Sequence, residues 1–295
     1  MRPMQILFIA LIVIFTNCSE SKESISEGVN KNKQNLEQNL PQLQFDYINS
    51  QGTTITTRFN PPQGFERVEV NENSFGHYLR KIPLKPHGAI VKYHNGYEKD
   101  RPDVYAAVVD LPIGTKNLHQ CADAVMRLKA DYHYSREEWD SIHFNLTNGF
   151  NLEYRQWKEG KRLKVDGNKT FWYKDSSPST DKDSYWKYLE TVWSFAGTLS
   201  LSKELKPIAI ENMQIGDVFI QGGSPGHAVI VIDVAINKTT DQKVFMLAQS
   251  YMPAQETQIL INPRYSELGV WYSSDFEKTL ITPEWNFRLG DLKRF

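Results

Sequence analysis

The segment that decides the fold spans residues 216–233 and reads GDVFIQGGSPGHAVIVID. An apolar strand follows Gly216 and Asp217, a glycine-rich turn comes next, and a second, continuously apolar strand begins at His227. Two apolar runs of strand length around such a turn are typical of a β-hairpin. Because the turn is rich in glycine, it leaves room for another group to approach His227. We therefore predict that His227 lies at the mouth of a hairpin and is a candidate general base.

The rest of the chain predicts both strands and helices. The apolar pattern indicates strands over 104–111 and 243–249 and helices over 74–80, 115–132 and 183–196. Thr115 is the expected N-cap of the middle helix, which places Cys121 more than one turn inside it and on its buried face. Strands and helices are segregated along the chain, which favours an α+β fold with an antiparallel sheet and packed helices.

Composition excludes one class of partner. The 295 residues include 34 Lys and Arg against 35 Asp and Glu, so there is no basic excess that would attract nucleic acid. The hydrophobic content of 40% supports a sizeable core, and we expect a single globular domain over residues 45–295.

The N-terminus is typical of an exported protein. Arg2 precedes an apolar run over residues 6–15, which is too short for an ordinary membrane span and stops just before Cys18. This pattern resembles a bacterial lipoprotein signal and predicts a signal peptide over 1–17, lipid on Cys18 and a flexible tether over 18–44. The membrane of the cell envelope is then a partner of the protein. The alternative is a plain secretory signal in which Cys18 is incidental.

If lipid occupies Cys18, the other cysteine, Cys121, has no intramolecular partner. Such a thiol is either buried and inert or reactive. The histidines at 77, 87 and 94 lack metal-ligand spacing, so we predict no metal and no cofactor. Trp172 and Trp186 belong to an aromatic-rich region that lines a glycan-binding groove in one interpretation and packs into the core in the other.

The hairpin resembles the histidine strand of NlpC-type papain-like cysteine amidases and peptidases, on the residues Gly216-Asp217 and His227-Ala228-Val229. The resemblance implies a papain-like core in which Cys121 is the nucleophile and His227 its base. The sequence His119-Gln120-Cys121-Ala122-Asp123 lacks the Asp-Cys-Ser pattern of those enzymes, and it also echoes a transglutaminase-like variant of the same core.

A polar residue on the next strand orients the histidine in that family. Asp233 is excluded, because six residues at about 3.3 Å each place it about 20 Å from His227 along the strand. Gln249 is the better candidate, since the antiparallel return strand brings it back toward His227. A shift of one residue in register would turn Gln249 to the other face of the sheet, so a solvent-facing Gln249 is the alternative.

Taken whole, the chain from Phe65 to Phe287 resembles a lipoprotein family known only as domain of unknown function 4846. The stretches that carry this resemblance are residues 74–80, 120–128, 226–230 and 249–253. Membership implies no known activity. The sequence thus predicts a cell-envelope lipoprotein that hydrolyses amide or peptide bonds, with cell-wall peptide as substrate. The alternative is a non-catalytic lipoprotein that binds envelope components or glycan.

Overall fold

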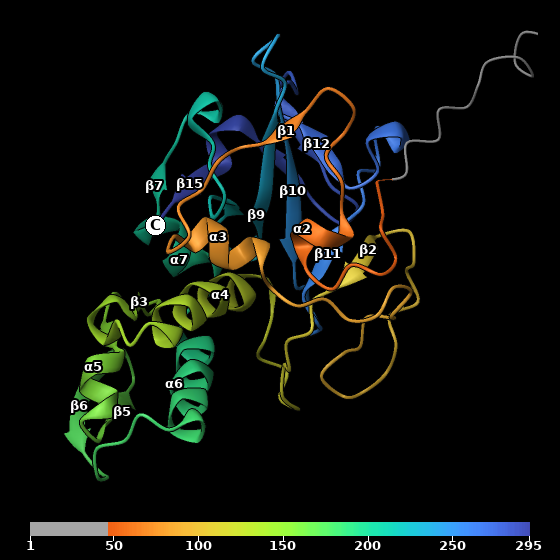
Figure 1. The fold of residues 1–295 in the computed structure, drawn as a ribbon. Coiled ribbons are helices and arrows are strands. Elements are labelled where there is room, and N and C mark those ends of the chain that lie inside the picture. The colour runs from red at the N-terminus through yellow and green to blue at the C-terminus, as the bar shows by residue number, and fades with distance from the viewer. Residues whose placement is uncertain (1–46) are drawn as a thin grey trace, which may run out of the picture. The chain divides into compact units, whose positions relative to one another are not determined.

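A nine-stranded antiparallel sheet forms the centre of residues 47–295, which are the residues that the computed structural model describes (Figure 1). The strands are β1 (Glu66–Arg67), β2 (Tyr105–Val108), β7 (Lys206–Pro207), β8 (Val218–Gln221), β9 (His227–Ile236), β10 (Lys243–Gln249), β11 (Gln258–Leu260), β12 (Trp271–Ser273) and β15 (Leu292–Arg294). Their order is β2-β11-β10-β9-β8-β15-β7, with β1 paired to β9 and β12 paired to β10. The expected signal peptide, the tether and Cys18 lie outside the described residues.

Three small hairpins and six helices complete the described part of the chain. The hairpins pair β3 (His143–Asn145) with β4 (Asn151–Glu153), β5 (Lys161–Asp166) with β6 (Lys169–Lys174), and β13 (Thr279–Ile281) with β14 (Asn286–Arg288). The helices are α2 (Ile55–Arg58), α3 (Phe75–Arg80), α4 (Cys121–Ser135), α5 (Tyr154–Lys158), α6 (Lys182–Phe195) and α7 (Thr198–Glu204). The predicted α+β class is therefore confirmed.

The hairpin of residues 216–233 is confirmed as β8 and β9. Gln221 pairs with His227 at its mouth, and Val218 pairs with Ile230 farther along. Both faces of β9 are covered, because Ile230 belongs to one hydrophobic cluster and Val229 to another. A strand buried on both faces needs apolar side chains at successive positions, which explains its unbroken apolar sequence.

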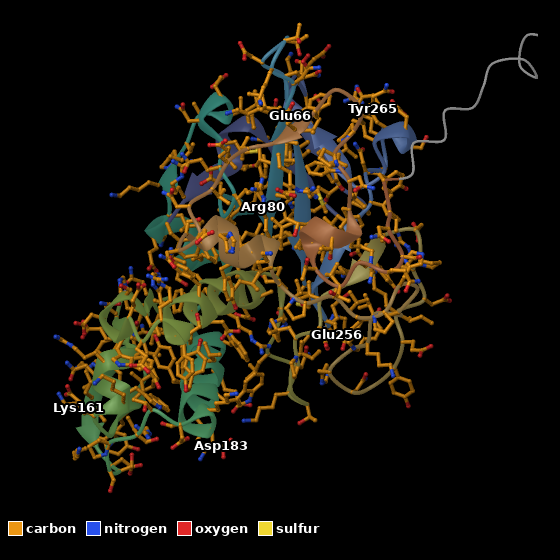
Figure 2. The ribbon with its side chains drawn as sticks, in the orientation of Figure 1. Glu66, Arg80, Lys161, Asp183, Glu256 and Tyr265 are labelled. Carbon is orange, nitrogen blue, oxygen red and sulfur yellow. The ribbon has the colours of Figure 1, made fainter. Side chains whose placement is uncertain are left out.

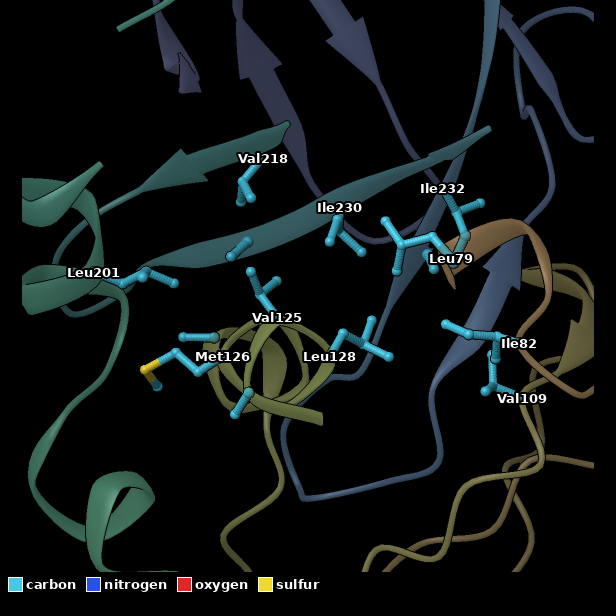
Figure 3. Close-up of a cluster of buried hydrophobic side chains, with 14 of the residues drawn as sticks. Leu79, Ile82, Val109, Val125, Met126, Leu128, Leu201, Val218, Ile230 and Ile232 are labelled. Atoms are coloured by element: carbon cyan, nitrogen blue, oxygen red, sulfur yellow. The ribbon is translucent and has the colours of Figure 1, made fainter. Parts of the chain in front are cut away.

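Helix α4 packs on one face of β9. Figure 3 shows Val125 and Leu128 on the helix opposite Ile230 and Ile232 on the strand. This contact holds the axis of α4 against the strand that begins at His227. Farther from the sheet, the segment from β3 to α6, green in Figure 1, lies along the other side of α4.

Two of the expected helices have well-defined N-termini. The Ser74 side chain accepts a hydrogen bond from the backbone N–H of His77 at the start of α3, and Asp181 accepts one from Ser184 at the start of α6. Both are ordinary N-caps. The helices predicted over 74–80 and 183–196 are thus confirmed to within one residue. Among the described residues, no helix combines the length and the apolar character needed to cross a membrane.

A bulge interrupts the pairing of β9 with β10. Met246 pairs with Asp233, whereas the next residue, Leu247, pairs with Val231, so β9 has one extra residue at this point. Because of this extra residue, the side chains of β9 do not simply alternate between the two faces of the sheet at the bulge. Asp233 is directed to two guanidinium groups, at 2.6 Å from Arg67 Nε and 2.7 Å from Arg80 Nε. Figure 2 labels Arg80 on α3.

Candidate active site

Helix α4 begins at Cys121, and the predicted start at Thr115 is wrong. Gln120 has extended backbone and is the N-cap, and its backbone N–H donates to the Asp123 carboxylate at 3.0 Å. That hydrogen bond caps the N-terminus of the helix, so the helix does not extend to residues before Gln120. Cys121 is therefore the first helical residue, where the positive end of the helix dipole is strongest.

The thiol of Cys121 lies beside the start of β9. The backbone N–H groups of Ala228, Ala122 and Cys121 all act to lower the pKa of the thiol. Burial outweighs them and raises the pKa of Cys121 to about 11. The residue nevertheless keeps partial exposure.

His227 and Gln249 are brought together, which settles the register left open by the sequence. His227 Nε2 lies 2.8 Å from Gln249 Oε1, and both side chains are 1% exposed. Gln249 thus shares the face of His227. Because Ala228 follows His227 directly, the sulfur of Cys121 lies beside the backbone from which the imidazole extends.

Aromatic rings enclose the imidazole of His227. The ring centroids of Tyr251, Trp285 and Phe287 lie 4.8, 5.5 and 5.9 Å from that of His227. This enclosure desolvates the ring and lowers the pKa of His227 to about 4, with the Lys99 charge acting in the same direction and Gln249 against it. His227 is therefore neutral at pH 7 and able to accept a proton.

A pocket of about 590 Å³ opens in front of Cys121. Its wall includes the turn residues 223–226, the helix start, and the side chains of Trp193, Leu199 and Met252. The turn requires glycine at Gly226, because a Cβ there would lie 2.5 Å from Thr198 Oγ1 and 2.7 Å from two backbone oxygens. The glycine-rich turn thus allows α7 and the hairpin to approach closely at the edge of the pocket.

The cysteine and the histidine are neutral at rest. Their pKa values of about 11 and about 4 make proton transfer between them unfavourable by on the order of 10 kcal/mol, at about 1.36 kcal/mol per unit. Attraction between the resulting charges would return only about 4 kcal/mol even if they were as close as about 4 Å, at an effective dielectric constant of about 20. The balance favours a thiol and a neutral imidazole.

This protonation state predicts how Cys121 alkylation depends on pH. Because the thiolate reacts, the rate of modification by iodoacetamide should rise about tenfold per pH unit from neutral pH toward the thiol pKa of about 11. The rate is measured by peptide mapping of the folded protein, with Cys121→Ala as the background. A rate that is already constant below pH 8 would contradict the neutral resting pair.

His227 and Gln249 are not among the residues that line this pocket, and the remaining candidates also lie outside it. Asp233 is held by its two arginines, in agreement with its exclusion as the partner of His227. Trp172 packs on Phe150 with ring centroids 5.8 Å apart, and Trp186 donates to Glu190 at 3.1 Å. Neither tryptophan lines the Cys121 pocket, and their proposed ligand role stays a prediction.

Sequence reasoning missed Lys99 and Glu284, which lie behind Gln249. Glu284 accepts hydrogen bonds from Gln249 and from Lys99, and Lys99 is only 4% exposed. Both come from loops with no motif around them, and only their three-dimensional position marks them. Among the described residues, no group of three or more His, Cys, Asp or Glu side chains converges as metal ligands would.

The structure shows an α+β protein in which a cysteine begins a helix and a buried histidine is hydrogen-bonded to a glutamine. The chain belongs to the family described as domain of unknown function 4846, whose sequence profile matches residues 55–294. No curated protein and no solved structure matches the chain significantly. The resemblance to NlpC-type enzymes therefore rests on the sequence motif alone.

Proposed function

We propose that this protein is a cell-envelope lipoprotein, exported and anchored by lipid on Cys18, that hydrolyses amide or peptide bonds through Cys121, His227 and Gln249. Its substrate class is cell-wall peptide. The sequence of residues 1–18 supports the anchor. The single observation that carries the catalytic part is the placement of the Cys121 thiol at the backbone N–H of Ala228, directly after a histidine that is hydrogen-bonded to Gln249.

The arrangement supports nucleophilic catalysis with general-base assistance. Gln249 occupies Nε2 of His227, so in the proposed mechanism the thiol proton goes to Nδ1. As the sulfur attacks the carbonyl carbon, Nδ1 takes the thiol proton. The imidazolium then gives this proton to the departing amine, and the C–N bond breaks to leave a thioester on Cys121.

Water completes the cycle. His227 takes a proton from water as the hydroxide oxygen attacks the thioester carbon, and the C–S bond then breaks to release the carboxylic acid and the thiol. In both steps negative charge develops on the carbonyl oxygen. The backbone N–H groups at the start of α4, including those of Cys121 and Ala122, are positioned to stabilise it.

With these roles, the core is papain-like in its chemistry. The helix that carries the nucleophile packs on a sheet whose adjacent strands β9 and β10 carry the base and its orienting residue. A neutral resting pair is compatible with turnover, because binding of a substrate removes water from the pocket and provides the electrophile to which the thiol proton transfer is coupled.

Hydrolysis in ¹⁸O-water tests the proposal. The protein is incubated with stem peptides released from peptidoglycan, and mass spectrometry should detect a new amine together with a carboxylate that has gained one ¹⁸O. Cys121→Ala should abolish both products, whereas Ser194→Ala, which alters another residue of the pocket wall, should retain them. An absence of cleavage, or cleavage that persists in Cys121→Ala, would overturn the proposal.

A non-catalytic role in binding envelope components is the second candidate. The observation that favours it is the raised pKa of Cys121 together with the lowered pKa of His227, since both values oppose a reactive ion pair. The two candidates differ in how Cys121 depends on His227. If the protein is an enzyme, a peptide substrate acylates Cys121 and His227→Ala slows this acylation. If it is a binding protein, Cys121 is acylated neither in the wild type nor in His227→Ala.

A further inference from the structure

A chain of hydrogen bonds continues behind the candidate active site. Gln249 Nε2 donates to Glu284 Oε2 at 2.6 Å, and Lys99 Nζ donates to the same oxygen at 2.7 Å. Lys99 Nζ also donates to Gln255 Oε1 at 3.0 Å. Glu284 lies in the turn between β13 and β14, and Lys99 precedes β2. Segments distant in sequence therefore meet at the side chain that contacts His227.

The chemistry of these groups determines which partner donates in each hydrogen bond. A lysine ammonium only donates hydrogen bonds, and a carboxylate only accepts them. Glu284 therefore requires the NH₂ of the Gln249 amide on its side, which leaves the amide oxygen for His227. That oxygen requires a proton on His227 Nε2. Since a neutral imidazole has one N–H, its lone pair is then on Nδ1.

We propose that Glu284, held by Lys99, is a positioning residue that fixes the Gln249 amide and thereby keeps His227 in the tautomer with its proton on Nε2. The inference rests on the proposed function only where it concerns catalysis, because the tautomer exists with or without activity. In that tautomer the lone pair on Nδ1 is the one that accepts the thiol proton. A rotated Gln249 amide would present N–H groups to Nε2 and favour the opposite tautomer.

Burial restricts the Gln249 amide to this one orientation. Gln249 and Lys99 are 1% and 4% exposed, so water does not readily replace a lost partner. A buried amide hydrogen without an acceptor is unfavourable, and this excludes the rotated amide while Glu284 is present. The same enclosure keeps Glu284 paired, since its side chain is 13% exposed and contacts the Lys99 ammonium.

Nitrogen-15 NMR of the imidazole ring tests the inference directly. The wild-type protein should show one His227 tautomer, with the proton on Nε2. Glu284→Ala removes the acceptor and should give a mixture of the two tautomers, and Glu284→Gln, which retains one acceptor oxygen, should give a smaller change. Glu204→Gln is the matched control, because Glu204 is a comparably buried carboxylate that accepts from Asn145. It should leave His227 unchanged.

Kinetics provide a second readout. Glu284→Ala should lower kcat for peptide hydrolysis by about 10- to 100-fold, the effect known for outer hydrogen-bond partners of metal-binding histidines, with little change in KM. A His227 tautomer that stays unchanged in both Glu284 variants would overturn the inference, even if Cys121-dependent hydrolysis is observed. A tautomer that follows Glu284 in a protein without hydrolytic activity would support the inference and overturn the proposed function. If Glu284→Ala fails to fold, the His227 tautomer measured in Glu284→Gln is the test.

Discussion

Replacing His227 with alanine is expected to lower kcat/KM for peptide hydrolysis by about 10²- to 10⁴-fold, the usual contribution of a positioned general base. The loss arises because Cys121 then has no neutral acceptor for its proton, and its pKa of about 11 leaves little thiolate at neutral pH. Activity should recover partly as the pH rises, since hydroxide then deprotonates the thiol. Initial rates at pH 7 and pH 10 measure both effects.

The control for this experiment is His133→Ala. His133 is also largely buried, and its Nδ1 lies 2.8 Å from Glu138 Oε2, but it belongs to the far end of α4. Its loss should leave kcat/KM within about twofold of wild type, as expected for a residue distant from the reacting atoms. Comparable losses in the two variants would mean that general destabilisation, and not a missing base, explains the effect.

Replacing Asp233 with alanine should produce the largest loss of stability, about 3–5 kcal/mol in the free energy of unfolding. Asp233 is fully buried and contacts Arg67 and Arg80, and the Arg80 side chain is 8% exposed. Without the carboxylate, two guanidinium groups remain close together with no counter-charge. Urea unfolding followed by circular dichroism measures the change.

Asp103→Ala provides the comparison for a solvent-exposed pair. Asp103 contacts Arg101 with side chains 65% and 50% exposed, so solvent screens the pair and its loss should cost far less stability than the loss of Asp233. An Asp233 variant that loses no more stability than the Asp103 variant would contradict the structural role assigned to the buried cluster.

The sequence was sufficient for the central elements of the fold. Apolar runs around a glycine-rich turn identified β8 and β9, and the return strand ending at Gln249 followed from its own apolar pattern. Local patterns of this kind reflect burial that the strand experiences along its whole length. For the same reason, the helix of residues 182–195 was recognisable from the spacing of its apolar residues.

The start of α4 was not predictable from spacing. Leu118 extends the apolar period upstream of Cys121, although the helix begins only after Gln120. What determines the boundary is the hydrogen bond from Gln120 to Asp123, and glutamine is not a typical N-cap residue. This start matters chemically, because Cys121 is then the first residue of the helix and not a residue of its interior.

The bulge in β9 and the chain behind Gln249 depend on distant parts of the sequence. The extra residue near Ile232 becomes visible only when β10 is paired with β9, and it turns Asp233 toward α3. Glu284 follows Gln249 by 35 residues, and Lys99 precedes Glu284 by 185. The local periodicity of the sequence does not reveal contacts between residues so far apart.

The most direct test of the account is a search for an acyl group on Cys121. Full-length protein is mixed with peptidoglycan stem peptides, quenched in acid within the first turnover and digested for mass spectrometry. We expect a thioester on the peptide that contains Cys121, with the mass of the acyl fragment, and we expect its loss in His227→Ala. Hydrolysis without any acyl group on Cys121, or an acyl group on another residue, would contradict it.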